Sequence, residues 1–230
     1  MIKCVFFDVD DTLFDSTGLT EKARRAAIEA MIEAGLPLSL EEGYELLMEI
    51  VKKYGSNYGK HFDALLDDLK IGWNPKIIAA GVYAYHRIKF AYLKPFPDVI
   101  PTLIELKKRD LKLGIISDGN PVKQWDKIIR LGLQNFFDVV ITSEEAGAEK
   151  PDLKIYEVAL EKSKCEPKNS VMVGDRIRKD ILGAKRTGML TVRFLHGKYK
   201  DEKPFSEEER PDFQIKSFRD LIDIIDKLNR

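Results

Sequence analysis

Acidic, hydroxyl and basic side chains recur in this sequence shortly after apolar runs. In chain order the groups are Asp8-Val9-Asp10-Asp11-Thr12, Ser117-Asp118-Gly119, Lys150-Pro151 and Gly174-Asp175 with Asp180. Carboxylates are hard oxygen ligands that suit Mg²⁺, and a carboxylate can attack phosphorus. A lysine can neutralise a transferring phosphoryl group. The groups are therefore typical of metal-assisted chemistry on a phosphate ester.

The apolar runs that precede these groups are short and rich in β-branched residues. With one further run near the C-terminus, they are Lys3–Phe7, Lys112–Ile116, Val139–Thr142, Ser170–Val173 and Leu190–Phe194. Amphipathic helices separate them, which predicts an α/β fold with a doubly wound parallel sheet buried on both faces. Because the carboxyl ends of parallel strands meet at one edge of a sheet, the polar groups should face one crevice. The helix after the second strand should bury Val122, Trp125 and Ile129.

The stretch from about Leu19 to Tyr92 contains no strand pattern. Ser39 and Glu42 form a capping box at the start of one helix, and Asn74-Pro75 begins another. We expect a small bundle of about four helices, inserted after the first strand. The predicted division is a catalytic domain of residues 1–17 and 94–230, and an inserted helical domain of residues 18–93.

The motifs together resemble those of the haloacid dehalogenase (HAD) superfamily. The matching residues are Asp8-x-Asp10-x-Thr12, Ser117, Lys150-Pro151 and Gly174-Asp175 with Asp180. The helical insert is similar to the first-class cap domain of that superfamily, so the resemblance covers the whole chain. It implies a magnesium-dependent phosphatase with a Rossmann-like core, which hydrolyses a small-molecule phosphate monoester through an aspartyl-phosphate intermediate.

The resemblance also implies a role for each carboxylate. Asp8 is expected to be the nucleophile, and Asp10 the general acid and base. Mg²⁺ is expected to be held by the carboxylates of Asp8 and Asp175 and by the backbone carbonyl of Asp10. Asp180 is expected to orient the catalytic lysine or a metal-bound water.

The remaining motif residues are expected to bind the phosphate. Ser117 donates its hydroxyl and Asp118 its backbone N–H, whereas the Asp118 carboxylate should point away from a phosphate anion. Lys150 is expected to contact the phosphoryl group and to keep Asp8 ionised, which makes it both a binding and a catalytic residue. Thr12 is expected to support the first motif without contacting substrate.

Composition and cysteine usage bound the possible partners. The 38 basic residues balance 38 acidic ones, so nothing favours nucleic acid or an anionic membrane as a partner. No apolar run approaches the roughly 18 residues of a membrane span, and the N-terminus lacks a signal-peptide pattern. We expect a cytoplasmic monomer or weak homodimer that binds a phosphorylated small molecule. Cys4 and Cys165 are interpreted as separate buried thiols, without a disulfide framework or zinc site.

Three other activities stay open at this point. A 2-haloacid dehalogenase uses the same nucleophile, but releases halide without protonating it and lacks the second aspartate of the first motif. A sugar phosphomutase keeps every motif and differs in how well the inserted domain excludes water. A receiver-type phosphorylation switch combines acids, a hydroxyl and a lysine, but has no inserted domain. The presence of Asp10 favours hydrolysis of a phosphate ester over dehalogenation.

Overall fold

The computed structural model describes residues 1–230 and contains one six-stranded parallel sheet. The strands are β1 (Cys4–Phe7), β2 (Lys112–Ser117), β3 (Val139–Thr142), β4 (Ser170–Gly174), β5 (Leu190–Phe194) and β6 (Phe213–Ile215). Their order across the sheet is β3-β2-β1-β4-β5-β6. Strand β1 therefore lies between β2 and β4, where the direction of winding reverses, and ligands of such sheets bind beyond the strand ends at this point.

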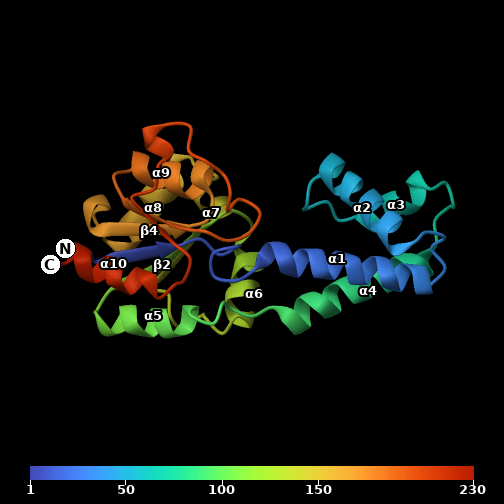
Figure 1. The fold of residues 1–230 in the computed structure, drawn as a ribbon, viewed down its shortest axis with the longest axis horizontal. Helices are drawn as coiled ribbons and strands as arrows, with labels where there is room; N and C mark the ends of the chain where they lie inside the picture. The colour runs from blue at the N-terminus through green and yellow to red at the C-terminus, as the bar shows by residue number, and fades with distance from the viewer. The chain divides into compact units, whose positions relative to one another are not determined.

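Helices cover both faces of the sheet (Figure 1). Those of this part of the chain are α5 (Val99–Lys108), α6 (Pro121–Arg130), α7 (Ser143–Ala146), α8 (Leu153–Ser163), α9 (Leu182–Arg186) and α10 (Asp220–Leu228). Helices α8 and α9 lie over one face, and α5 and α10 over the other. The predicted doubly wound parallel sheet is confirmed.

Successive residues of β1 pack into different layers. Phe6 belongs to the core beneath α8, which also contains Tyr156, whereas Phe7 stacks on Phe218 with ring centroids 6.0 Å apart. Gly114 of β2 leaves room for the Phe6 ring, since a Cβ there would lie 2.6 Å from it. Full burial on both faces explains why the strand reads as a continuous apolar run.

Two details differ from expectation. Strand β6 was not predicted, because its three residues Phe213–Ile215 include only one buried side chain and carry no pattern. Helix α6 does not bury the expected stripe: Val122 is 76% and Ile129 55% exposed. It buries Gln124 and Ile128 instead. The prediction for α6 was wrong because Gln124 binds the Asp118 carbonyl, a tertiary contact that no periodicity records.

The chain divides into two compact units, residues 1–17 with 94–230, and residues 18–93. The second unit is formed by α1 (Ser16–Glu33), which starts in the first unit, and by α2 (Leu40–Tyr54), α3 (His61–Asp68) and α4 (Pro75–Tyr92). The helices share a core that includes Ile28, Leu47, Leu65 and Ile77. The expected capping box of Ser39 and Glu42 is present, and Asn74 caps α4.

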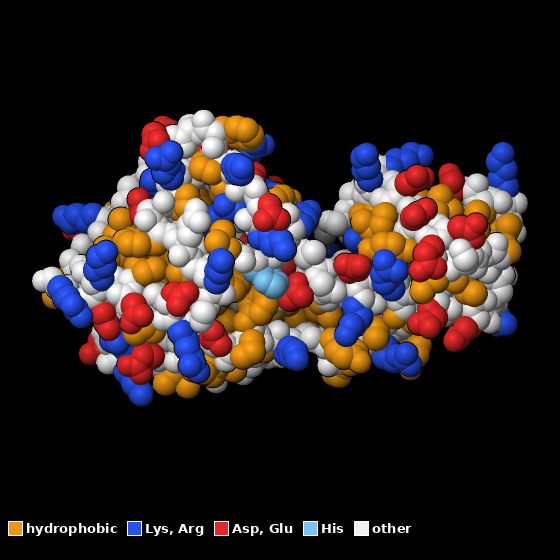
Figure 2. All heavy atoms as spheres, in the orientation of Figure 1, with side chains coloured by type: hydrophobic (Ala, Val, Ile, Leu, Met, Phe, Trp, Pro, Cys, Tyr) orange, Lys and Arg blue, Asp and Glu red, His pale blue; other side chains and the backbone are white.

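The surface carries both signs of charge. On the face shown in Figure 2, Lys and Arg side chains are interspersed with Asp and Glu. No helix in the structure combines the length and the apolar composition that crossing a bilayer requires.

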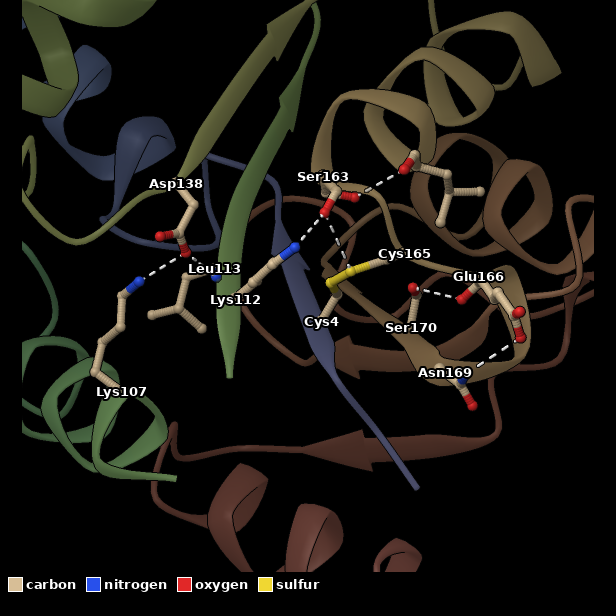
Figure 3. The surroundings of a disulfide bond; sticks show 11 residues. Cys4, Lys107, Lys112, Leu113, Asp138, Ser163, Cys165, Glu166, Asn169 and Ser170 are labelled. Carbon is tan, nitrogen blue, oxygen red and sulfur yellow. Dashed lines mark hydrogen bonds and ion pairs between the residues drawn. A yellow bond between two sulfur atoms is a disulfide. The ribbon is translucent and has the colours of Figure 1, made fainter. Parts of the chain in front are cut away.

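Cys4 and Cys165 form a disulfide, so their interpretation as separate thiols was wrong (Figure 3). Their Cα atoms lie 6.5 Å apart, within the range that such a bond spans. The sequence separation of 161 residues hides this proximity. The sheet creates it, because Cys4 pairs with Ser170 across β1 and β4 and Cys165 precedes Ser170 by only a short turn.

Reduction of this disulfide should destabilise the sheet-containing unit. A bridge that closes so long a loop removes entropy from the unfolded chain. We expect Cys4→Ser with Cys165→Ser to cost about 2–5 kcal/mol of unfolding free energy, or roughly 5–15 °C in Tm for a chain of this size.

Calorimetry of the double variant, and of the wild type with and without a reductant, measures this effect. The reductant should not change the Tm of the double variant. An equal Tm for oxidised wild type and the double variant would show that the bridge contributes nothing.

Candidate active site

The centre of the site is a buried lysine between two carboxylates. Lys150 Nζ donates to Asp8 Oδ1 and to Asp180 Oδ1, both at 2.6 Å. The three side chains are almost inaccessible to solvent. Asp8 directly follows β1, and its N–H binds the Val173 carbonyl of β4 at 2.9 Å. The structure therefore brings together groups from three separate motifs at the central strand end.

Asp180 reaches this lysine because of local backbone features. It lies in a π-helical turn, Ile177–Ile181, and its Oδ2 accepts the N–H of Arg176 at 2.9 Å. A Cβ on Gly174 would lie 2.4 Å from the Asp180 carboxyl carbon, so only glycine fits there. The buried Tyr156 hydroxyl donates to the Lys179 carbonyl at 2.7 Å and anchors the turn from below.

Asp175 differs from the other two buried carboxylates. Both of its side-chain oxygens are buried and have no hydrogen-bond partner. Oxygens of Asp8, Asp175 and Asp180 lie within 4.8 Å of one another. Asp180 is already occupied by Lys150 and the Arg176 N–H, which leaves Asp8 and Asp175 as the carboxylates available to a cation. This donor set of hard oxygens fits Mg²⁺.

Burial perturbs the acidity of these groups. It raises the pKa of Asp8 to about 7, with Lys150 opposing the rise and Asp180 adding to it. Burial also raises the pKa of Asp175 to about 9, and the charges of Asp180 and Asp8 raise it further. Burial disfavours the charged form of Lys150, but Asp180 and Asp8 outweigh it and raise its pKa well above the usual value. The lysine therefore stays charged.

Asp10 lies at the more open side of the site. Its Oδ2 accepts a hydrogen bond from Lys127 Nζ of α6 at 2.6 Å, and the Asp10 side chain is 40% exposed. The next residue, Asp11, has a left-handed φ of 56°, and its carboxylate binds the backbone N–H and the hydroxyl of Thr17. Thr12 is fully buried and its hydroxyl has no partner in the protein. The turn thus separates Asp10 from Asp8.

The second motif is held by side chains that neutralise its acid. Ser117 ends β2 and is buried. The Asp118 Oδ1 accepts the backbone N–H of Lys150 at 2.8 Å, and its Oδ2 pairs with Lys179 Nζ. Gly119, with φ of 123°, donates its N–H to the Ser143 hydroxyl at 2.9 Å. The Asp118 carboxylate therefore supports the Lys150 backbone and is balanced by a lysine.

Sequence reasoning missed three residues of this arrangement: Lys127, Lys179 and Tyr156. Lys179 stands next to Asp180, and that adjacency is a weak signal of its position. Lys127 and Tyr156 lie on helices remote in sequence from their partners, and no pattern marks them. Their roles arise from how the helices pack on the sheet.

Comparisons with known proteins identify the family. A family model described as haloacid dehalogenase-like hydrolase matches residues 2–188. The chain belongs to this family. The predicted family resemblance is confirmed. The motifs that carried it lie after the strands of the sheet, as expected.

Relatives with assigned names extend over the full length. The chain is 54% identical to a glyceraldehyde 3-phosphate phosphatase of Methanopyrus kandleri, with 99% of each chain covered. It is 48% identical to the protein of that name from Methanocaldococcus jannaschii, with 100% of each covered. A crystal structure of a HAD phosphatase from Thermococcus onnurineus aligns with a TM-score of 0.68 at 27% identity, covering 97% of this chain and 98% of that one.

Added Mg²⁺ should stabilise this protein more at high pH than at low pH. The pKa values of Asp8 and Asp175 are raised to about 7 and about 9, above the ordinary value of about 4. Their contribution to the stability of the metal-free protein is therefore complete below about pH 4 and is lost as pH rises through 7 to 9. A cation binds carboxylates in their ionised form, so the expected effect of Mg²⁺ grows over the same window.

Differential scanning calorimetry with and without Mg²⁺ measures this dependence. At a concentration near one hundred times Kd we expect about 2.7 kcal/mol of stabilisation at about pH 9, or roughly 5–10 °C. We expect little at about pH 5.5, where most of these carboxyl groups bind protons. Asp175→Asn should lose most of the Mg²⁺ effect at every pH. A shift independent of pH would contradict the assignment of these carboxylates.

Proposed function

We propose that this protein is a Mg²⁺-dependent phosphatase whose substrate is glyceraldehyde 3-phosphate. One structural observation carries the chemistry: Asp8 is paired with a buried lysine beside Asp175, whose oxygens have no protein partner. The substrate is suggested by full-length relatives of that name at 46–54% identity. The proposed chemistry rests on the geometry of this chain, and the proposed substrate rests on similarity to these relatives.

In the proposed first step Asp8 attacks phosphorus and the alcohol departs. Lys150 favours the ionised form of Asp8 against the effect of burial and faces the incoming phosphoryl group, while the Ser117 hydroxyl and the Asp118 N–H donate to its oxygens. The carboxylates of Asp8 and Asp175 and the Asp10 carbonyl would hold Mg²⁺, which would supply charge that offsets the repulsion between carboxylate and phosphate dianion. The product of this step is phosphorylated Asp8.

Asp10 is the proposed acid and base for both steps. It protonates the departing alkoxide, and the same group then removes a proton from the water that hydrolyses the phosphorylated Asp8. Its side chain is 40% exposed beside Lys127, so solvent can reach it. Dehalogenation would not use this proton, which favours the phosphatase over the dehalogenase. A phosphomutase would share both steps and would pass the phosphoryl group to a sugar hydroxyl.

Location and assembly belong to the same proposal. A phosphorylated three-carbon substrate is charged and is retained inside cells, so we propose a cytoplasmic enzyme. The disulfide is compatible with that location if the source is a hyperthermophile, in which intracellular disulfides persist, and a charged fraction of 33% is in keeping with such a source. We propose a monomer or weak homodimer, which light scattering on the purified protein tests.

Asp8→Asn should abolish hydrolysis of glyceraldehyde 3-phosphate without unfolding the protein. The amide keeps the shape but lacks the anionic oxygen that attacks phosphorus. We expect at least a roughly thousandfold loss of kcat/KM, equal to about 4 kcal/mol of barrier. Released phosphate is measured against a panel of phosphorylated metabolites, and 2-chloroacetate tests dehalogenation.

The matched control is Asp126→Asn on the exposed side of α6, which should retain activity. More than a tenth of wild-type activity in Asp8→Asn would exclude Asp8 as nucleophile. A strong preference for another ester in the panel would overturn the substrate while leaving the chemistry intact.

Asp10→Asn should slow the first step in proportion to the basicity of the leaving oxygen. A three-carbon alkoxide needs a proton, whereas p-nitrophenolate leaves almost unaided. We expect single-turnover release of the alcohol from glyceraldehyde 3-phosphate to fall at least roughly tenfold more than release of p-nitrophenolate. With the aryl ester, phosphorylated protein should accumulate, because the second step has lost its base. Equal losses for both esters, with no trapped phosphoprotein, would assign Asp10 a structural role.

A further inference from the structure

Arg193 of β5 is a buried cation that forms no ion pair. Only 2% of its surface is exposed, and its guanidinium donates entirely to backbone carbonyls. Nε binds the Asp175 carbonyl at 3.2 Å, Nη1 the Glu202 carbonyl at 2.8 Å, and Nη2 the Tyr199 carbonyl at 2.6 Å. Removing a charge from water is costly unless its surroundings compensate it, so this arrangement requires a local reason.

The reason lies in what holds Asp175. The carboxylates of Asp8 and Asp180 are oriented by hydrogen bonds that their side-chain oxygens accept from Lys150 and, for Asp180, also from the Arg176 N–H. Neither side-chain oxygen of Asp175 has such a partner. Without a bound cation, the direction of the Asp175 carboxylate therefore depends on its backbone, and Arg193 is the side chain that binds its carbonyl.

Arg193 also attaches a second segment to the same point. The residues from His196 to Glu202, here called the strap, follow β5, and Arg193 binds the carbonyls of Tyr199 and Glu202 within it. The Tyr199 ring in turn lies under the Arg176 guanidinium, 4.5 Å from its centroid to the guanidinium carbon. Arg176 directly follows Asp175. The strap therefore holds the Asp175 loop in two ways: through Arg193, which binds backbone carbonyls of both segments, and through the contact of Tyr199 with Arg176.

The other end of the strap lies against the first motif. A Cβ on Gly197 would be 2.7 Å from the Asp11 carboxyl carbon, so the strap backbone packs closely on the turn that follows Asp8. His196 Nε2 lies 3.4 Å from the Asp15 carboxylate. One segment thus contacts both the turn that follows the nucleophile and the loop that carries Asp175.

We propose that Arg193 is a positioning residue for the metal site, which fixes the Asp175 backbone and joins it to the strap. This inference rests on the proposed function, because it assigns the Asp175 carboxylate to Mg²⁺. Arg193 itself contacts neither metal nor substrate. Its loss should weaken Mg²⁺ binding, because the loss of a residue that supports a metal ligand commonly lowers metal affinity by about 10–100-fold. The phosphoryl chemistry should stay intact at saturating Mg²⁺.

The test compares Arg193→Lys and Arg193→Met with wild type by titration calorimetry of Mg²⁺. We expect Kd to rise at least roughly tenfold in both variants, because lysine keeps the charge but cannot bind three carbonyls from one planar group. The apparent KM for Mg²⁺ should rise in parallel, with kcat at saturating Mg²⁺ within about threefold of wild type.

Arg109→Met is the matched control. Arg109 is partly buried and joins two elements, through Asp226 and Glu105, but none of its partners belongs to the site. It should lower Tm with an unchanged Mg²⁺ Kd. If Arg193→Met does not fold, Tyr199→Leu tests the strap contact to Arg176 and should raise Kd in the same direction.

Wild-type Mg²⁺ affinity in the folded Arg193 variants would overturn the inference and make Arg193 a purely structural residue. If wild type itself binds no Mg²⁺, the proposed function fails, and hydrogen exchange then decides the positioning role. Faster amide exchange confined to residues 175–180 and the strap in Arg193→Lys supports it. Unchanged exchange there overturns it.

Discussion

The contact of Lys150 with Asp8 and Asp180 is the interaction on which the site depends. The Lys150 side chain is 3% exposed, and a buried ammonium group is stable only where acids compensate its charge. Here both 2.6 Å contacts are buried, so the lysine is held between two carboxylates that compensate its charge. The same contact serves the proposed chemistry, because it holds Asp8 at the strand end where a phosphate would bind.

Several residues around the site make room for this contact or hold its members in place. Gly174 leaves the space that the Asp180 carboxylate occupies, and Tyr156 beneath the sheet edge anchors the turn that carries Asp180. The Asp118 carboxylate fixes the Lys150 N–H. The parallel order of β3, β2, β1 and β4 then brings the motifs that follow these strands to one sheet edge. The site is thus assembled by backbone contacts as much as by its own side chains.

Sequence patterns predicted the parts of this molecule that are governed by local chemistry. Five strands follow from apolar runs, and the caps at Ser39 and Asn74 follow from side chains that bind the next turn. The disulfide, the short strand β6 and the burial of α6 were mispredicted or missed. Each depends on which distant segments meet. The roles of Lys127 and Arg193 were not predicted for the same reason, because a lysine or arginine acquires a role only through the partner that the fold supplies.

The balance of buried charge shows how a cation would be accommodated in this site. Three carboxylates, Asp8, Asp175 and Asp180, face one ammonium, so two negative charges are uncompensated when all are ionised. The raised pKa values of Asp8 and Asp175 express this excess, and one divalent cation would balance it. An incoming phosphate dianion would then meet a neutral cluster rather than a negative one. Lys127 and Lys179, already paired with Asp10 and Asp118, keep the surrounding acids from restoring the repulsion. A bound divalent cation would therefore make the ionised form of this site more favourable for an anionic substrate.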